Sequence, residues 1–309
     1  MKKVLVTGAA GFLGSHLCDK LLKEGYHVIG VDNFFRGKKN NLPVHENFEF
    51  YNHDLSKEKI KGLESINLDY VYHYAAINGT KYFYDIPNKV LNDNIKITQN
   101  TLSSLRSQIK KIFYASSSEV YGPTPKVPTK EEELINLNID ADRDSYASSK
   151  AIGEFLIRSW CKENKVSYII LRPFNTYGKR MATDGYGQVI PEFIERVNQG
   201  ENFYLFGNGS QTRSFCYVKD HVNIAVKLLE RCENQVLNIG FDEEISINDL
   251  AKKIHFILNK KFVVENKPAW ENDTKWRKPS LIKLRKYIGN YRFTNLEEGL
   301  RKILDIKLN

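Results

Sequence analysis

Short apolar runs alternate with longer amphipathic segments through the first half of the chain. Leu13, Leu17 and Leu21 recur every four residues and mark one helical face, and Gly25 follows them as a residue that commonly ends a helix. The pattern predicts helices at residues 12–23, 92–108 and 146–164, and strands at residues 3–7, 28–32, 48–52, 70–75, 111–116 and 167–172. Strands that alternate with helices of this length indicate an α/β fold, in which helices cover both faces of a parallel sheet.

The pattern is less regular in the second half. It predicts helices at 189–200 and 220–232, a loop at 177–185, and a strand at 203–206 that ends in the turn Gly207-Asn208-Gly209. Two or three further helical patterns and short strands follow residue 240. We therefore expect a doubly wound domain over residues 1–173, with segments near 210–240 returning to it, and a smaller α/β domain over residues 174–309.

Composition indicates an ordinary globular protein. The 309 residues are 41% hydrophobic and 27% charged, a usual balance for folded domains. No apolar run approaches the ~20 residues of a membrane helix, and the short run Val4-Leu5-Val6 is interrupted by Thr7-Gly8, unlike a signal peptide. We expect a cytoplasmic protein without a membrane span.

The cysteines and the net charge narrow the classes of partner. The four cysteines lie far apart, with neither CxxC spacing nor a histidine cluster, so we expect buried free thiols and no metal site. The net charge of +9 would suit nucleic acid, an anionic membrane or an anionic substrate. Because the lysines are scattered and no nucleic-acid motif is present, we expect no nucleic-acid partner.

A glycine-rich turn stands between the first predicted strand and the first helix. Gly8, Gly11 and Gly14 would let the backbone turn tightly and approach a pyrophosphate at the helix N-terminus. Asp32 ends the second strand, where a carboxylate binds ribose hydroxyls and repels a 2′-phosphate. The sequence therefore predicts an NAD site, and Arg36 keeps NADP open because a guanidinium there could receive a 2′-phosphate.

A second group of residues has the chemistry of hydride removal. Tyr146 and Lys150 are four residues apart on one face of a predicted helix, and a lysine cation beside a phenol lowers the pKa of that phenol. Ser116, Ser117 and Ser118 follow the 111–116 strand at the edge where parallel sheets bind ligands. A serine hydroxyl there could orient a reacting oxygen.

Together these motifs resemble a known family. The chain resembles the extended short-chain dehydrogenase/reductases, specifically their nucleotide-sugar epimerase/dehydratase group, nearly from end to end. The matching segments are TGAAGFLG at 7–14, Asp32, His53-Asp54-Leu55, His73-Tyr74-Ala75-Ala76, SSSEVYG at 116–122, YASSK at 146–150, Phe174-Asn175-Thr176-Tyr177-Gly178, GNGSQTRSF at 207–215 and Arg277-Lys278-Pro279. The last segment departs from the family, because Ser280 replaces the usual Asp.

The resemblance implies a Rossmann domain that binds NAD and a smaller domain that binds a nucleotide sugar. It implies Tyr146 as the base, Lys150 as its electrostatic helper, and Ser117 as the orienting hydroxyl. The implied cofactor residues are Gly8, Gly11, Phe12, Leu13, Gly14, Asp32, Asn33, Arg36, Asp54, Leu55, Ala75, Ala76, Tyr146 and Lys150. The implied substrate residues are Thr80, Asn175, Val189, Arg213 and Arg277, the two arginines on the diphosphate. Members often form homodimers through two long helices, here 92–108 and 146–164.

The shared first step of this group is oxidation of the sugar C4 hydroxyl to a ketone. Epimerisation, 4,6-dehydration, decarboxylation of a uronate or release of the ketone can follow, and the sequence leaves the net reaction open. Glu119, a catalytic candidate near C5 and C6, is similar to a glutamate of the decarboxylases and of some 4,6-dehydratases. Arg143 is similar to an arginine of both decarboxylases and GDP-mannose dehydratases, and FNTYGKRM at 174–181 resembles the decarboxylases most. Ser118 argues against the dTDP-glucose dehydratase type, which has an Asp there, whereas the segment 77–84 matches no decarboxylase pattern.

A different class of protein also fits the fold. A non-catalytic NAD-binding sensor could use the same nucleotide site, because a fold alone does not define a function. Such a sensor would be expected to have lost the Tyr-Lys pair, and both Tyr146 and Lys150 are present. The sequence therefore favours an enzyme.

Overall fold

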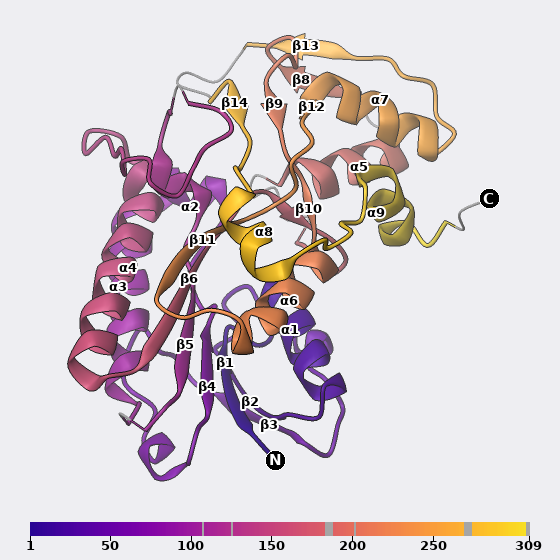
Figure 1. Ribbon diagram of the computed structural model, residues 1–309. Coiled ribbons are helices and arrows are strands. Elements are labelled where there is room, and N and C mark those ends of the chain that lie inside the picture. The colour runs from indigo at the N-terminus through magenta and orange to yellow at the C-terminus, as the bar shows by residue number, and fades with distance from the viewer. Residues whose placement is uncertain (107, 125, 183–187, 201, 269–273, 307–309) are drawn as a thin grey trace.

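A seven-stranded parallel sheet forms the centre of the molecule (Figure 1). The computed structural model describes residues 1–306 except 107, 125, 183–187, 201 and 269–273. The sheet has the order β11-β6-β5-β4-β1-β2-β3, so the chain winds outward in both directions from β1 and β4. Its strands are β1 Lys3–Thr7, β2 His27–Asp32, β3 Phe48–Asn52, β4 Tyr70–His73, β5 Lys111–Ala115, β6 Ser167–Pro173 and β11 Gln235–Ile239.

Helices cover both faces of this sheet. On one face lie α1 Phe12–Lys23 and α6 Val218–Lys227, and on the other α3 Pro87–Ser103 and α4 Asp144–Asn164 (Figure 1). Alternate side chains of β1 serve the two faces: Val4 and Val6 pack in the same core as Leu17 of α1, whereas Leu5 packs in the core of Ile157 of α4. The apolar runs of the sequence are thus strands buried on both faces.

A smaller lobe stands above the carboxyl ends of the strands (Figure 1). Phe193, Phe203, Leu250 and Ile254 contribute to its own apolar core. Its elements are α5 Val189–Gln199, α7 Ile247–Ile257, α9 Leu296–Ile303 and the short strands β8 Tyr204–Phe206, β9 Thr212–Arg213, β12 Ile245–Ser246, β13 Glu265–Lys267 and β14 Trp276–Arg277. The remaining elements are α2 Thr80–Asp85, α8 Ile282–Ile288, β7 Thr176–Tyr177, β10 Cys216–Tyr217, and 3₁₀ turns at Lys39–Asn41, Leu63–Ser65, Ser118–Tyr121 and Leu228–Glu230.

Several predicted boundaries are wrong. The helix predicted at 92–108 begins at Pro87 and ends at Ser103, because proline is favoured at the first helical position, where its missing N–H costs no hydrogen bond. The strands predicted to reach 75 and 116 end at His73 and Ala115. The helix predicted at 220–232 is α6 followed by a 3₁₀ turn. In the predicted loop 177–185, Tyr177 belongs to β7, and residues 183–185 lie outside the described residues.

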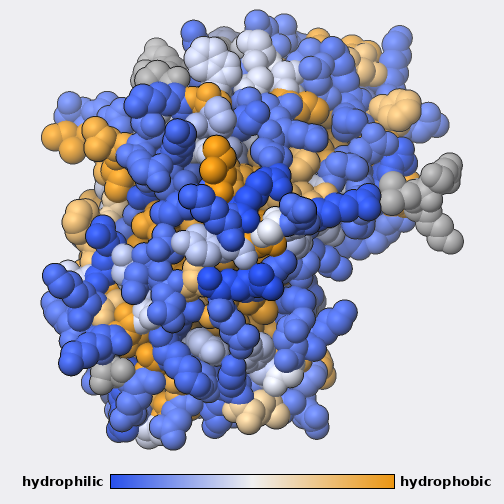
Figure 2. All heavy atoms as spheres, in the orientation of Figure 1, coloured by the Kyte–Doolittle hydropathy of each residue, from blue (hydrophilic) through white to orange (hydrophobic). Residues whose placement is uncertain are grey.

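The surface and the cysteines have the features of an ordinary globular protein. Figure 2 shows a largely hydrophilic face on which apolar residues are mostly scattered. Within the described ranges, no helix is long and apolar enough to cross a membrane, and no three His, Cys, Asp or Glu side chains gather as a metal site would require. All four cysteines are buried free thiols.

Candidate active site

A cleft of about 770 Å³ lies between the carboxyl edge of the sheet and the smaller lobe. This volume is ordinary for a site that takes a small organic ligand. The cleft brings together residues that are far apart in the sequence. From the predicted set its lining includes Phe12, Leu13, Ala76, Thr80, Ser117, Glu119, Tyr146, Lys150, Asn175, Val189, Arg213 and Arg277.

The glycine-rich turn has the close packing that a pyrophosphate site needs. Gly8 has φ 74°, and a Cβ there would lie 2.9 Å from the backbone N of Ala75. A Cβ on Gly14 would lie 2.0 Å from the carbonyl O of Gly8, so only glycine lets the turn rest on α1. Gly11 is the N-cap of α1, and the free amides of a first helical turn attract phosphate. These residues fit a dinucleotide.

Asp32 is held against this turn by backbone donors. Its Oδ2 accepts from Ala10 N at 3.0 Å and its Oδ1 from Phe34 N at 2.7 Å. Burial raises the pKa of Asp32 while these backbone hydrogen bonds oppose the rise. Arg36, the candidate for a 2′-phosphate, donates instead to the carbonyl O of Asn78. The carboxylate is therefore the group fixed at the predicted ribose position.

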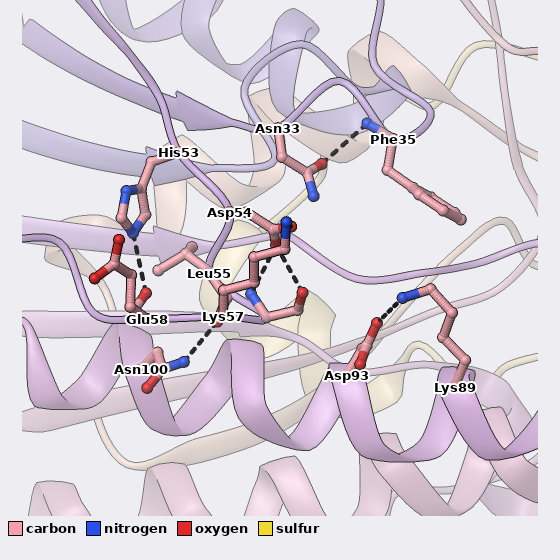
Figure 3. Close-up of polar contacts among 11 residues, drawn as sticks. Asn33, Phe35, His53, Asp54, Leu55, Lys57, Glu58, Lys89, Asp93 and Asn100 are labelled. Carbon is pink, nitrogen blue, oxygen red and sulfur yellow. Dashed lines mark hydrogen bonds and ion pairs between the residues drawn. The ribbon is translucent and has the colours of Figure 1, made fainter.

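The predicted adenine-side residues lie together in a group of polar contacts (Figure 3). Asp54 Oδ1 accepts from the backbone N and the hydroxyl of Ser56, at 2.9 and 2.7 Å. Although burial works to raise it, the pKa of Asp54 is lowered by Ser56 and Asn33. Leu55 is buried, and its carbonyl accepts from Asn100 Nδ2 at 2.8 Å. Asn33 and Asp54 therefore face each other from two loops, at the position that the family resemblance assigns to the adenine side of the cofactor.

Tyr146 and Lys150 lie on the first two turns of α4, and both are almost completely buried. Lys150 Nζ donates to the Ala115 carbonyl at 2.7 Å and lies 5.8 Å from the centroid of the Tyr146 ring. Burial lowers the pKa of Lys150 to about 7, although Glu154 opposes this. Burial and Glu119 raise the pKa of Tyr146. The expected lowering of the phenol pKa is therefore wrong, because the effect of burial dominates.

Ser117 lies at the carboxyl end of β5, as predicted. Its Oγ accepts from the backbone N of Glu119 at 3.1 Å, which caps the 3₁₀ turn Ser118–Tyr121. A hydrogen bond from Ser117 lowers the pKa of Tyr146, against the larger effects of burial and Glu119. The hydroxyl and the phenol are thus adjacent, as joint contact with one reacting oxygen requires.

Glu119 faces three arginines. Arg277 donates hydrogen bonds to both carboxylate oxygens of Glu119, with 3.2 Å between Nη2 and Oε2. Arg143 Nη2 lies 3.5 Å from the same Oε2. Burial works to raise the pKa of Glu119, but Arg277, Arg143 and Arg213 lower it to about 2. Glu119 is therefore a carboxylate at neutral pH and holds no proton to donate.

The two predicted diphosphate arginines are neighbours on one small sheet. Arg213 on β9 and Arg277 on β14 are register partners in a parallel pair, although the sequence separates them widely. Arg277 is also the main partner of Glu119. Thr80 begins α2, Val189 begins α5, and Asn175 donates to the Ser214 carbonyl at 3.0 Å. Each of these three residues lines the cleft.

Two features of the site were missed by sequence reasoning. Phe83 of α2 stacks on Tyr146, with ring centroids 4.7 Å apart and planes at 10°. Glu154, one turn after Lys150, accepts from Ser116 Oγ at 2.6 Å and from Arg172 Nε at 2.8 Å. The four-residue spacing of Lys150 and Glu154 was available as a signal, whereas no pattern pairs Phe83 with Tyr146.

Comparison with known proteins defines the class. The model of the NAD dependent epimerase/dehydratase family matches residues 4–240, and the chain belongs to this family. It is 36% identical over 307 residues to UDP-glucuronic acid decarboxylase 1 of Danio rerio, covering 98% of this chain and 72% of the relative. UDP-glucuronic acid decarboxylase 5 of Arabidopsis thaliana is 34% identical over 305 residues, covering 96% and 87%.

Solved structures agree on the architecture. The UDP-glucuronic acid 4-epimerase of Bacillus cereus, in complex with UDP-glucuronic acid and NAD, has a TM-score of 0.86 at 30% identity and 98% coverage of both chains. The UDP-glucose 4-epimerase of Thermotoga maritima has a TM-score of 0.87 at 30% identity, covering 98% of this chain and 97% of that one. The chain is thus an NAD-dependent enzyme that modifies a nucleotide sugar through oxidation at C4. A non-catalytic sensor is not supported.

Proposed function

We propose that this enzyme decarboxylates a UDP-linked uronic acid after oxidising its C4 hydroxyl. The observation that carries this choice is Glu119, held as a carboxylate by Arg277 and Arg143 beside Tyr146. The decarboxylase relatives, which span nearly the whole chain, support the same choice. The uronic acid 4-epimerase among the similar structures supports a uronate as the sugar.

The first step needs a base at the C4 hydroxyl. Tyr146 takes the hydroxyl proton, and Ser117 orients the same oxygen. The chemistry that bound NAD would supply is reversible acceptance of the C4 hydride. The phenol must first give up its own proton; Lys150, with its pKa near 7, accepts that proton, and the resulting lysine cation stabilises the phenolate because opposite charges favour each other in a buried site. The turn of Gly8 and Gly14, Asp32, Asn33 and Asp54 are the residues that would hold the cofactor.

The second step follows from the relative positions of the ketone and the acid. A C4 ketone and the C6 carboxylate of a uronate are in a β-keto acid relationship, so the C5–C6 bond can break with its electrons stabilised on O4. Carbon dioxide leaves, C5 takes a proton from water, and Tyr146 can donate to O4. Loss of carbon dioxide needs no acid for a leaving group, whereas expulsion of a C6 hydroxyl does. Glu119, ionised down to about pH 2, has no such proton.

The charge of the cleft suits this substrate class. Arg143, Arg213 and Arg277 each lower the pKa of Glu119, so three positive charges lie around this one carboxylate. A diphosphate and a sugar carboxylate would together balance that excess of positive charge. We propose that Arg213 and Arg277 bind the diphosphate, with Asn175, Thr80 and Val189 against the sugar-nucleotide.

A 4-epimerase is the second candidate, because the similar structures include 4-epimerases at 30% identity. It would return the hydride to the opposite face of the ketone and keep the carboxylate. A 4,6-dehydratase and a simple C4 dehydrogenase lack a comparable supporting observation. The four outcomes differ in product mass, stereochemistry or NADH release, so one assay separates them.

The test is incubation of the purified enzyme and NAD with UDP-glucuronate, and with UDP-glucose as the matched sugar without a carboxylate. Product mass and reduced-nicotinamide absorbance are followed together. The proposal predicts loss of carbon dioxide from UDP-glucuronate alone, without accumulation of NADH. Water loss, an unchanged mass with inverted C4, or stoichiometric NADH would each replace decarboxylation by another reaction.

We also propose a homodimer formed through α3 and α4. Phe155 and Ile152 of α4 are 69% and 38% exposed, and exposed apolar residues on a long helix favour association. A two-fold pairing of these helices would bury both side chains in each subunit. A cytoplasmic location is part of the proposal.

A further inference from the structure

The loop after β2 is tied to the start of α2 at the rim of the cleft. Arg36 Nη1 donates to the carbonyl O of Asn78, and the guanidinium lies 5.7 Å from the centroid of the Tyr82 ring. The Phe35 ring lies 5.5 Å from the same ring. We refer to Phe35, Arg36, Asn78 and Tyr82 as the Arg36 clasp. The clasp joins a loop of the cofactor site to a helix that lines the cleft.

The loop side of the clasp is fixed to the predicted ribose position. Asp32 accepts from Phe34 N at 2.7 Å on one side of Arg36, and Lys38 N donates to the Ala10 carbonyl at 3.1 Å on the other. A Cβ on Gly37 would come within 2.8 Å of Asp32 Oδ1. Figure 3 shows Asn33 and Phe35 on this loop, above Asp54 and near Lys89 of α3. Binding at Asp32 would therefore restrict the segment that carries Arg36.

The other side of the clasp leads to the catalytic phenol. Ile77 is fixed by Asn94, whose Oδ1 accepts from Ile77 N at 2.7 Å and whose Nδ2 donates to Ile77 O at 3.1 Å. Gly79 then has φ 143° and ψ 123°, a conformation that favours glycine, and α2 follows. Because Asn78 lies between the fixed Ile77 and Gly79, its bond to Arg36 sets the direction in which α2 leaves.

We propose that Arg36 is a positioning residue that couples the ribose end of the NAD site to α2, and through Phe83 to Tyr146. Bound cofactor restricts the motion of the loop at Asp32, and the Arg36 clasp restricts α2 in turn. Phe83 of α2 is then held in its stack on the Tyr146 ring. Such coupling is reciprocal, so a ligand that fixes α2 also strengthens cofactor binding. The inference rests on the NAD site of the proposed function and not on the choice of sugar or of net reaction.

Hydrogen exchange of α2 tests this without any nucleotide sugar. The amides of Tyr82 and Ile86 donate to Gly79 O and Tyr82 O at 2.9 and 3.0 Å, and report the order of α2. Exchange is measured with and without saturating NAD in the parent and in Arg36→Ala, Arg36→Lys and Lys39→Ala. Lys39 is an exposed cation of the same loop, so its variant controls for lost charge.

NAD is expected to slow exchange in α2 by about fivefold or more in the parent and in Lys39→Ala. In Arg36→Ala at NAD saturation the slowing falls below about twofold. Arg36→Lys is intermediate, because it keeps the charge without the planar group. Unchanged exchange of β1 and β4 amides shows that each variant is folded. Equal protection of α2 in Arg36→Ala and the parent, or no protection in the parent, would overturn the proposal.

Discussion

Arg277 and Glu119 form a bidentate ion pair at the base of the cleft, between residues 158 positions apart in the chain. The pair joins β14 of the smaller lobe to the 3₁₀ turn that follows β5 of the large sheet. Arg143 adds a second cation from the start of α4. One carboxylate therefore organises residues from both lobes around Tyr146, and this arrangement makes Glu119 a site residue whose charge can be tested.

Glu119→Gln is expected to lower turnover by about 10²-fold with the fold retained. The neutral amide leaves Arg277 and Arg143 without their counter-charge, and they then repel each other beside the reacting sugar. Initial rates and circular dichroism measure the two effects. Glu132→Gln, at an exposed acid on the loop that follows Glu119, is the matched control and keeps parental rates. Parental turnover in Glu119→Gln would remove Glu119 from the mechanism.

The same pair gives a pH dependence of stability. The pKa of Glu119 is about 2 in the folded chain, below its ordinary value of 4.5, so its contribution is complete above about pH 5 and is lost as the pH falls toward 2. Denaturant unfolding across this range is expected to give a higher free energy of unfolding for the parent than for Glu119→Gln. The difference should shrink as the pH falls. A difference in the free energy of unfolding that stays the same at every pH would show that the pKa of Glu119 is not lowered on folding.

Lys150→Met is expected to abolish turnover and to raise the free energy of unfolding at pH 7. The folded pKa of Lys150, about 7, lies below its ordinary value of 10.5. The unfolded chain therefore binds more protons between these values, and parental stability rises with pH by up to about 1.4 kcal/mol per pH unit. The difference in the free energy of unfolding between Lys150→Met and the parent should therefore shrink toward pH 10.

The control for this experiment is Lys162→Met, at an exposed lysine of the same helix. Its free energy of unfolding should stay close to that of the parent, because the substitution changes only an exposed side chain. A Lys150→Met variant that is less stable than the parent at pH 7 would show that the lysine is a favourable structural group and not a desolvated catalytic one.

Phe155→Glu is expected to convert the dimer to a monomer, because it places a charge in the proposed α3–α4 interface. Light scattering after size-exclusion chromatography gives the mass directly. Phe256→Glu is the matched control, since Phe256 is 74% exposed on α7, away from that interface. A parent that is monomeric, or a Phe155→Glu dimer, would place the interface elsewhere or remove it.

The sequence predicted the parts of the site that depend on local spacing. The glycine turn, Asp32 at the end of β2 and the Tyr146–Lys150 face of α4 each follow from a strand, a turn or a helical period. The side-by-side placement of Arg213 and Arg277 came only from the family resemblance, because two-residue strands leave no periodic signal. The Phe83 stack and the Arg36 clasp depend on how α2 leaves Gly79, which is a tertiary property.

Electrostatics were the least predictable part. The helical spacing of Tyr146 and Lys150 suggested a lowered phenol pKa, yet burial and Glu119 raise it. Burial is a property of the assembled fold and cannot be read from a four-residue motif. Glu119 was a candidate for abstracting or delivering a proton near C5 and C6, and its three arginine neighbours keep it in the ionised form, which can accept a proton.

Turnover of UDP-glucuronate carrying deuterium at C4 tests the central claim most directly. Oxidation at C4 predicts slower turnover than with the unlabelled sugar, and decarboxylation with return of the hydride predicts a product that has lost carbon dioxide and kept the deuterium. Tyr146→Phe should lower this turnover by about 10³-fold while NAD still binds, and Tyr51→Phe, at a partly exposed strand residue, should not change it. Turnover of the deuterated sugar at the same rate as the unlabelled sugar would contradict oxidation at C4. Release of carbon dioxide by Tyr146→Phe at the parental rate would also contradict it.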